Sequence, residues 1–418
     1  MILSQGGPRR LLAELLDRAL AAVHGERAVR RVLSEHPLAG PVRIIAIGKA
    51  AQAMTEGACG VLGDRVKGGL AISKPGHLSP ERLAPWGIQA VEGGHPLPTA
   101  GSLEAGERLL AEVARSAGTR LLFLISGGAS SLVEEPAAGL GLAELARMNR
   151  WLLGSGLPIQ DVNSVRTGVS LIKGGGLLGR LAETDPRVIA ISDVVEDDPA
   201  VIGSGLLVPS AGLARRVAEL DLPEWLRSWV EMGLAARGRT PDRGPPVELA
   251  ATLDMAKRAV AAAATESGLE ARLEQRPVQG DAAERGRELA RALTRGPPGL
   301  RIWGGETTVR LPERPGRGGR NQHLALAAAI ELAGRGDCFL LSAATDGSDG
   351  PTEDAGALVD GATLERAALD GLDAAACLTG ADSGRLLAAS GDLIDTGPTG
   401  TNVMDLILGL KLGHPAPV

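Results

Sequence analysis

Residues 42–54 read VRIIAIGKAAQAM, and this stretch decides the fold of the first half of the chain. A continuous apolar run is followed by Gly48 and Lys49 and then by a helix-like segment, which is typical of a buried parallel strand that turns into a helix. Comparable apolar runs ending in Gly, Ser or Asp are GGLAIS (68–73), RLLFLISGG (120–128) and RVIAISD (187–193). Helix-like segments separate these runs, at 50–63, 102–118 and 142–156. The sequence therefore predicts an α/β fold with a doubly wound, mainly parallel sheet and helices on both faces.

The 418 residues exceed the size of one ordinary domain and predict two. Apolar residues at helical spacing between Leu11 and Val23 predict an amphipathic first helix, which we expect to pack on the first domain. A stretch rich in Gly, Pro and Arg at 232–246 indicates the boundary, and we place the domains at 1–238 and 239–418. Beyond it the α/β alternation resumes, with helices at 250–266 and 281–293 and strand-like runs at 271–275, 300–309, 337–347 and 392–400.

Composition restricts the partners. A net charge of -6 argues against nucleic acid or an anionic membrane surface, so a bound anion needs local basic groups. The 3 cysteines show neither CxxC spacing nor a disulfide framework. Charged residues interrupt the first helix, and no stretch approaches the roughly 20 apolar residues of a membrane span. We expect a cytoplasmic protein that acts on small molecules.

Polar groups gather where the first apolar runs end. Lys49 lies at a helix start, where the positive end of the helix dipole disfavours a cation and a bound anion would favour it. A solvated lysine is the alternative. ISGGASS (125–131) places hydroxyls and amides where a phosphate or carboxylate can approach, although a plain glycine turn has the same composition. Its candidate binding residues are Ser126, Gly127, Gly128, Ser130 and Ser131.

A second polar string, VRTGVSLIKGGG (165–176), adds two cations. Arg166 suits the bidentate binding of a substrate carboxylate, whereas Lys173, beside Gly174 and Gly175, suits a phosphate. Asp193 ends the last apolar run of this half, where a carboxylate can hold a divalent metal or accept a hydroxyl proton.

The second half repeats the placement of Lys49. In GRGGRNQHL (316–324), Arg320 lies at a predicted helix start after Gly318 and Gly319, with Asn321 as the expected N-cap. Two cations at helix starts in different halves of one acidic chain favour a shared polyanionic ligand.

Two loops complete the candidates. ATDGSDGPTEDAGA (344–357) carries Asp346 and Asp349 without the spacing of an EF-hand, which favours a metal bound jointly with the phosphates of a nucleotide. DTGPTGTNVMDL (395–406) supplies Thr399 and Asn402 in a turn that we expect to precede another helix. A purely structural turn is the alternative for this string.

Two glycine-containing strings come close to familiar nucleotide-binding motifs. The Gly-Lys pair at 48–49 lacks the upstream glycine of a Walker A loop. GGGLLG (174–179) fits GxGxxG, with Asp193 at the distance of a ribose contact, which would indicate a nicotinamide dehydrogenase. The short segment that follows leaves little room for the required crossover helix.

Taken in order, these motifs resemble the MOFRL-type glycerate 2-kinases from about residue 44 to residue 410; GGRNQ and ATDGSDGPT are the most specific strings. The resemblance implies two α/β domains, the first Rossmann-like, with an active-site cleft between them. It implies transfer of the γ-phosphate of ATP to the 2-hydroxyl of D-glycerate with a divalent cation such as Mg²⁺. Some members carry the name hydroxypyruvate reductase, which keeps an NAD(P)-dependent reductase as the alternative.

The resemblance also implies residue roles. It marks Lys49 and Arg320 as phosphate-stabilising cations and Asp193 and Asp346 as the acidic residues, either of which holds the metal or takes the hydroxyl proton. The chain departs from the family pattern at Thr99, Leu206 and Gly176, where Asp, Pro and a basic residue are usual. The sequence leaves the oligomeric state open, with a homodimer as one option, and leaves a non-catalytic ligand sensor as a further alternative.

Overall fold

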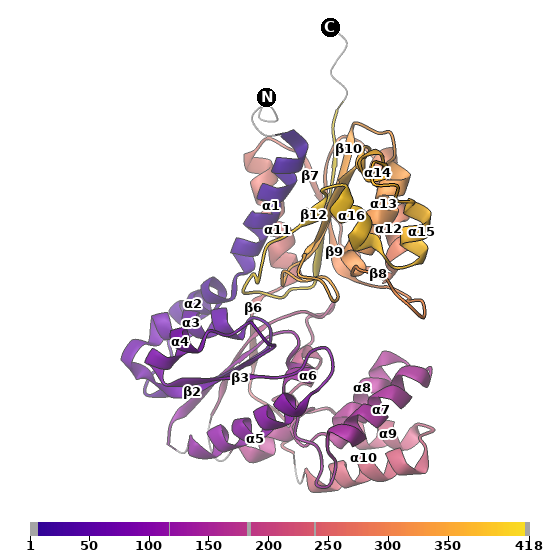
Figure 1. Cartoon of the computed structure of the whole chain (residues 1–418). Coiled ribbons are helices and arrows are strands. Elements are labelled where there is room, and N and C mark those ends of the chain that lie inside the picture. Colours follow the sequence, from indigo (N-terminus) through magenta and orange to yellow (C-terminus); the bar gives the residue numbers. More distant parts are fainter. Residues whose placement is uncertain (1–6, 117, 182–184, 238–239, 414–418) are drawn as a thin grey trace. The chain divides into compact units, whose positions relative to one another are not determined.

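The computed structural model describes residues 7–116, 118–181, 185–237 and 240–413, which form two compact units (Figure 1). The N-terminal unit comprises residues 25–250, and the C-terminal unit comprises residues 7–24 and 251–413. The first helix, α1 (Gly7–Val23), therefore belongs to the C-terminal unit. Its position in the sequence had suggested that it packs on the first domain. Its buried stripe, which includes Leu12, Leu15 and Leu16, packs beside α11 (Leu253–Glu266).

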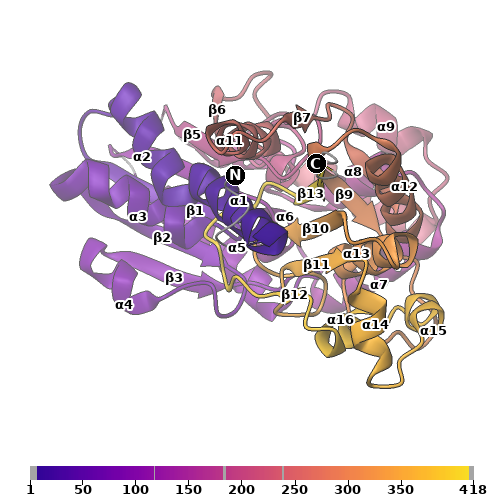
Figure 2. The same cartoon turned by 90° about the horizontal axis from the view of Figure 1, so that it is seen from above.

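The N-terminal unit is built on a Rossmann-type sheet. Among its described residues the strand order is β3-β2-β1-β4-β5-β6, and Figure 2 shows β3, β2 and β1 side by side. The strands are β1 (Val42–Ile47), β2 (Val66–Ser73), β3 (Ile88–Glu92), β4 (Arg120–Ile125), β5 (Arg187–Ile191) and β6 (Val247–Ala251). The pairs β1–β2, β1–β4, β2–β3 and β4–β5 are parallel, which confirms the predicted sheet. The order reverses between β1 and β4, which is where ligands bind in folds of this kind.

Continuous apolar strands are required because helices cover both faces of this sheet (Figure 1). Ile45, Ile47 and Phe123 belong to one hydrophobic core and have no exposed surface. Each such side chain stabilises the fold by about 1.5–3 kcal/mol on burial. The covering helices are α2 (Gly25–Glu35), α3 (Ala51–Leu62) and α5 (Ala100–Arg115), with the short α4 (Pro80–Leu83) and α6 (Ala129–Leu132). Thr99 is the N-cap of α5 in a reciprocal capping box with Ser102.

A small helical layer with its own hydrophobic core adjoins the sheet. It consists of α7 (Leu142–Gly154), α8 (Ile159–Val169), α9 (Leu213–Glu219) and α10 (Glu224–Ala236). Leu152, Val165 and Leu226 are among its buried members. Of these helices only α7 was expected from the sequence, although α10 carries apolar residues at helical spacing, among them Leu226 and Val230.

The described part of the C-terminal unit contains a mixed sheet in the order β12-β11-β10-β13-β9-β7, with β8 paired to β9. The strands are β7 (Ala271–Leu273), β8 (Val278–Asp281), β9 (Gly299–Thr308), β10 (Cys338–Ala344), β11 (Gly356–Asp360), β12 (Leu393–Ile394) and β13 (Asp405–Lys411). The remaining helices are α12 (Ala282–Arg295), α13 (Arg320–Leu332), α14 (Thr363–Ala368), α15 (Ala374–Thr379) and α16 (Ser383–Ala389). In Figure 1, α12 and α13 cover one face of the sheet, while α1 and α11 cover the other.

One expectation about this unit was wrong. The segment after DTGPTG was expected to be a helix, but it is β13, which pairs antiparallel with both β10 and β9. Residues Asp405 to Leu410 are all buried. Because a strand covered on both faces is apolar throughout, its sequence lacks the alternation that distinguishes a strand from a buried helix.

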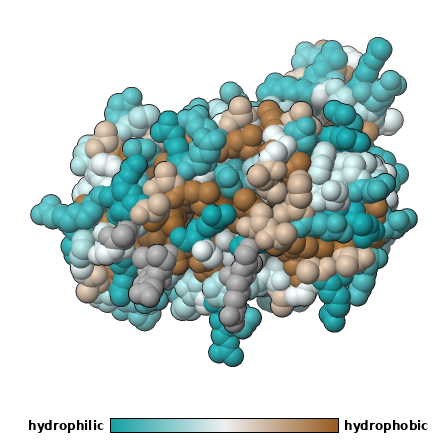
Figure 3. Space-filling view, turned by 90° about the horizontal axis from the view of Figure 1, so that it is seen from below, coloured by the Kyte–Doolittle hydropathy of each residue, from teal (hydrophilic) through white to brown (hydrophobic). Residues whose placement is uncertain are grey.

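The surface seen in Figure 3 carries hydrophobic residues along its middle and hydrophilic residues around them. Within the described ranges, no helix combines the length and apolar character that a membrane crossing requires. The three cysteines are buried free thiols. Burial raises the pKa of Cys59 to about 12, so this thiol is a poor nucleophile.

Candidate active site

The loops after β1 and β4 bind each other at the point where the strand order reverses. The Lys49 amide donates to the Gly127 carbonyl at 2.9 Å, and the Ala50 amide donates to Ser126 Oγ at 3.0 Å. Gly48 has φ 130°, and a Cβ added there would lie 2.1 Å from Ser126 Oγ. Only glycine allows this approach, so the structure brings together two strings that the sequence had singled out separately.

The side chain of Lys49 lies over the glycine loop. A Cβ added at Gly128 would lie 3.3 Å from Lys49 Cγ and 3.2 Å from His95 Cδ2. Ser131 Oγ donates to the Gly128 carbonyl at 3.3 Å. Asp193 follows β5, the strand next to β4, and is half-buried. Lys49, the SGGASS loop and Asp193 thus follow the carboxyl ends of three consecutive strands of the sheet.

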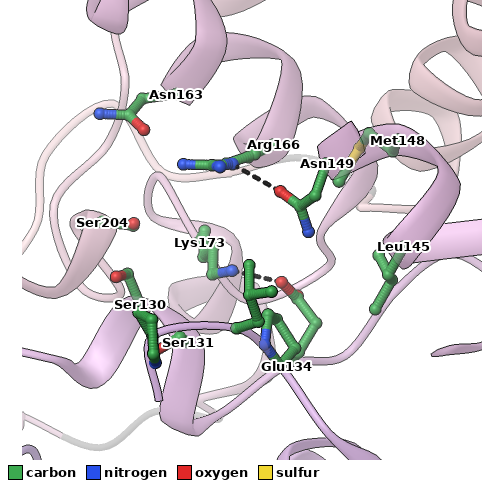
Figure 4. Close-up of a pocket in the computed structure, with 13 residues that line it drawn as sticks. Ser130, Ser131, Glu134, Leu145, Met148, Asn149, Asn163, Arg166, Lys173 and Ser204 are labelled. Carbon is green, nitrogen blue, oxygen red and sulfur yellow. Dashed lines mark hydrogen bonds and ion pairs between the residues drawn. The ribbon is translucent and has the colours of Figure 1, made fainter. Parts of the chain in front are cut away.

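A cavity of about 70 Å³ lies beside this loop in the N-terminal unit (Figure 4). It has room for a few waters or one small organic ion. Its walls come from the loop after β3, the SGGASS loop and the helical layer. The lining residues are Pro96, Leu97, Pro98, Ser130, Ser131, Glu134, Leu145, Met148, Asn149, Asn163, Arg166, Lys173 and Ser204.

One wall of the cavity holds a buried ion pair. Lys173 Nζ contacts Glu134 Oε2, and the two side chains are 4% and 5% exposed. Ser170 Oγ donates to Glu134 Oε1 at 2.5 Å. The predicted phosphate ligand Lys173 is therefore already balanced by a carboxylate that the sequence analysis did not name. The amides of Gly174 and Gly175 are also engaged, since they donate to the Ser204 and Gly205 carbonyls at 2.8 and 2.7 Å.

The second cation of the cavity, Arg166, is differently placed. Its Nε donates to Asn149 Oδ1 at 2.9 Å, which fixes the guanidinium against the helical layer (Figure 4). Burial lowers the pKa of Arg166. Behind the cavity, the buried Arg237 donates from Nη1 to the Thr167 carbonyl at 3.1 Å. A Cβ added at Gly176 would lie 2.9 Å from Arg237 Nη2, so a guanidinium occupies the space that a side chain at this position would enter.

In the C-terminal unit, Arg320 begins α13 as predicted, but it is paired. Its Nε and Nη2 donate to the two carboxylate oxygens of Asp405 at 2.6 and 3.0 Å, and its Nη1 donates to Glu306 Oε1 at 2.5 Å. Burial would lower the pKa of Arg320, but the carboxylates of Asp405 and Glu306 outweigh it and raise the pKa. The charge conflict at this helix start is thus offset within the unit, without a ligand.

The start of α13 is capped by a residue distant in the sequence. Asp349 accepts from the amides of Asn321 and Gln322 at 3.0 and 2.8 Å, and a Cβ added at Gly319 would lie 2.3 Å from its Cγ. The prediction that Asn321 is the N-cap of α13 is therefore wrong, because Gly319 holds that position. Burial outweighs these hydrogen bonds and raises the pKa of Asp349 to about 7.

The other candidates of this unit lie around the end of β10. Asp346 is 5% exposed and accepts from the Ser348 amide at 3.1 Å. Thr399 Oγ1 donates to the Thr345 carbonyl at 2.5 Å, and Asn402 is buried in the same loop. Gly318, with φ 152°, precedes the helix start. Among the described residues no group of three or more His, Cys, Asp or Glu is arranged to hold a metal ion, and a metal shared with nucleotide phosphates needs no such group.

Comparison with known proteins identifies the family of this chain. A family model described as a domain of unknown function (DUF4147) matches residues 11–221, and the MOFRL family model matches residues 299–405. D-glycerate 2-kinase of Thermotoga maritima is 35% identical over 96% of this chain and 98% of its own length. The chain belongs to the MOFRL-type glycerate 2-kinase family.

Two further relatives complete the comparison. A crystal structure of glycerate kinase from Thermotoga maritima has a TM-score of 0.83 at 34% identity, covering 97% of this chain and 99% of that one. A protein of Agrobacterium vitis that carries a hydroxypyruvate reductase name is 34% identical over 95% of this chain and 93% of its own length. Members with both names thus share the length and pattern of this family.

Several residues of the site were missed by sequence reasoning. Glu134 lies in SSLVEEP, a string with no motif signal, and Asn149 lies inside α7. Asp405 lies within the string DTGPTGTNVMDL, and Glu306 lies within the strand-like run 300–309. Their acidic side chains were the available signal. Their pairing with Arg320 depends on the register of β9 and β13, which places Asp405 opposite Gly305.

Proposed function

We propose that this glycerate 2-kinase family member transfers the γ-phosphate of ATP to the 2-hydroxyl of D-glycerate, giving 2-phosphoglycerate and ADP. The observation that supports this most is the placement of Lys49 and the Gly127–Gly128 loop at the strand-order reversal of a Rossmann-type sheet. A cation beside glycines at such a position favours a phosphate-bearing ligand.

The mechanism relies on positioned charge. Phosphoryl transfer has a loose transition state whose negative charge is spread over the equatorial oxygens. We assign Lys49 and Arg320 to the stabilisation of that charge, which is strongest where the cations are held before the reaction begins. The bidentate pairing of Arg320 with Asp405 provides such rigidity.

Two aspartates complete the assignment. Asp193 orients or deprotonates the 2-hydroxyl, and Asp346 would hold the metal ion, with the reverse allocation as the alternative. Carboxylate oxygens at the ends of strands fit Mg²⁺, which prefers one or two carboxylates together with substrate phosphates. When bound, Mg²⁺ neutralises part of the phosphate charge.

The glycine string GGGLLG, on which the reductase alternative depends, lacks the structural context of a dinucleotide-binding motif. GGGLLG follows helix α8, and its last residues form a 3-10 helix, Gly176–Arg180. A dinucleotide fingerprint instead follows a strand and opens a long helix on which the pyrophosphate rests. We therefore prefer the kinase, acting in the cytoplasm on small molecules.

Phosphorus NMR tests the proposal. Purified protein incubated with ATP, Mg²⁺ and D-glycerate is expected to give ADP and a 2-phosphomonoester. A parallel assay follows NADH absorbance with hydroxypyruvate and no ATP. NADH oxidation without ADP formation would favour the reductase, and ligand-induced thermal stabilisation without either product would favour the sensor. Light scattering separates a monomer from the homodimer.

A further inference from the structure

We propose that the cavity of Figure 4 binds the acceptor, that it selects a short monocarboxylate bearing a hydroxyl group that does not react, and that Glu134 recognises this hydroxyl. The proposal rests on the proposed kinase function and adds the location and the chemistry of acceptor selection. It follows from the charges, the hydrogen-bonding capacity and the size of the cavity.

The charges of the lining favour one carboxylate. The described lining contains two cations, Arg166 and Lys173, and one carboxylate, Glu134. Two positive charges and one negative charge give the lining a net charge of +1. The buried Arg237 behind the cavity adds a further positive charge that acts on Glu134, so the cavity attracts a carboxylate. A second carboxylate placed close to the buried Glu134 would be repelled by it, whereas a neutral hydroxyl in the same place would not be.

Arg166 is the cation that suits the carboxylate. Lys173 is paired with Glu134, whereas no described carboxylate forms an ion pair with Arg166. Its hydrogen bond to Asn149 uses Nε alone, so the terminal nitrogens keep their capacity for a planar carboxylate. Asn163 lies three residues earlier on α8, on the same helix face, and lines the same cavity.

Glu134 and Lys173 together match a hydroxyl group. Oε1 of Glu134 accepts from Ser170 Oγ at 2.5 Å and from the Glu135 amide at 3.0 Å, and Oε2 accepts from Lys173. A carboxylate offers about four acceptor positions and an ammonium offers three donors. Glu134 can therefore accept a further hydrogen bond, and Lys173 can donate one. A hydroxyl, which donates and accepts, fits such a pair. Three donors already form hydrogen bonds with Glu134, which stabilises its carboxylate form. Glu134 is therefore better suited to position the acceptor hydroxyl than to take a proton from it.

The size and walls of the cavity limit the rest of the acceptor. A cavity of about 70 Å³ has room for a small acid. Leu145 and Met148 form an apolar part of the wall, on the helical layer (Figure 4). Longer polar sugar acids would have to place hydroxyls against these side chains without partners, at a cost in affinity.

The test compares Glu134→Gln with the matched control Glu135→Gln, whose side chain does not line the cavity. The acceptors are D-glycerate and D-lactate, which lacks the 3-hydroxyl. We expect Glu134→Gln to lower kcat/KM for glycerate by about 10- to 100-fold and to leave that for lactate within about threefold, since only glycerate loses a hydrogen bond. Glu135→Gln should change neither. An equal loss for both acceptors, or an equal effect of the control, would overturn the role of Glu134.

Binding measurements separate this proposal from the kinase assignment. Calorimetry of the wild-type protein, without ATP, should show D-glycerate binding at least tenfold more tightly than hydroxymalonate, which carries a second carboxylate in place of the 3-hydroxyl carbon. This measurement needs no turnover and no variant, so it holds if Glu134→Gln does not fold or if no kinase activity is found. Equal affinities would refute acceptor selection by charge.

Discussion

The pairing of Arg320 with Asp405 gives a quantitative prediction, because it adds a structural role to a residue that we propose to be catalytic. Asp405 is 3% exposed, and removal of Arg320 alone would leave its carboxylate buried without its main partner. We expect Arg320→Met to lower the free energy of unfolding by about 3–5 kcal/mol. A loss of activity in that variant would therefore mix unfolding with chemistry.

A double-mutant cycle separates the two effects. The two hydrogen bonds from Arg320 to Asp405 are 2.6 and 3.0 Å long, but the Arg320 side chain is 33% exposed. Hydrogen bonds to charged groups contribute about 1.5–3 kcal/mol each, so two fully buried bonds would contribute about 3–6 kcal/mol. The partial exposure of Arg320 weakens the pair and lowers this to about 2–3 kcal/mol. We therefore expect a coupling energy of about 2–3 kcal/mol between Arg320→Met and Asp405→Asn. Glu306→Gln, at a position that is 47% exposed, should cost at most about 1 kcal/mol.

Urea unfolding of the four proteins of the cycle, with Glu306→Gln as the control, measures these energies. Steady-state kinetics of the folded double variant then reports the catalytic role of Arg320, for which we expect a loss of about 10²- to 10³-fold in kcat. A coupling energy near zero would contradict the structural part of the reasoning. Undiminished turnover by the double variant would remove Arg320 from the mechanism.

Three further predictions concern single positions. Lys49→Met should lower kcat/KM by about 10²- to 10³-fold with an unchanged urea midpoint, whereas exposed Lys67→Met should change neither quantity. Because the pKa of Asp349 is raised from 3.8 to about 7, the folded protein binds its proton more tightly; the associated stability is full below pH 4 and is lost as pH rises through 7. Urea unfolding at pH 5 and pH 8 should show a smaller loss for Asp349→Asn than for the wild type, and equal losses would contradict the assignment. Gly48→Ala should lower the free energy of unfolding by about 3 kcal/mol or more, because the added Cβ would lie 2.1 Å from Ser126 Oγ in the neighbouring loop. Gly40→Ala is the control: Gly40 has φ 80° and open space around it, so this change should lower the free energy of thermal unfolding by about 1 kcal/mol. Similar costs at the two glycines would show that the loops can move apart.

The parts of the fold that sequence reasoning predicted share a local cause. A strand covered by helices on both faces must be apolar along its whole length, so β1, β4 and β5 were recognisable from their own residues. The loops after them were recognisable for the same reason, since Gly48, Gly127 and Gly128 interrupt apolar runs. Local patterns also placed Arg320 at the start of α13.

What the sequence did not reveal depends on residues that meet only after folding. Glu134 pairs with Lys173 across 39 positions, and Asp405 pairs with Arg320 across 85. No local pattern encodes such a partner, because sheet register and helix packing decide which side chains face each other. The sequence by itself thus determined the Rossmann-type half, the family and the candidate anion-binding groups. Only the tertiary structure decided which cations are already balanced by carboxylates, since the electrostatic energy of a side chain depends on distance and burial and not on its neighbours along the chain.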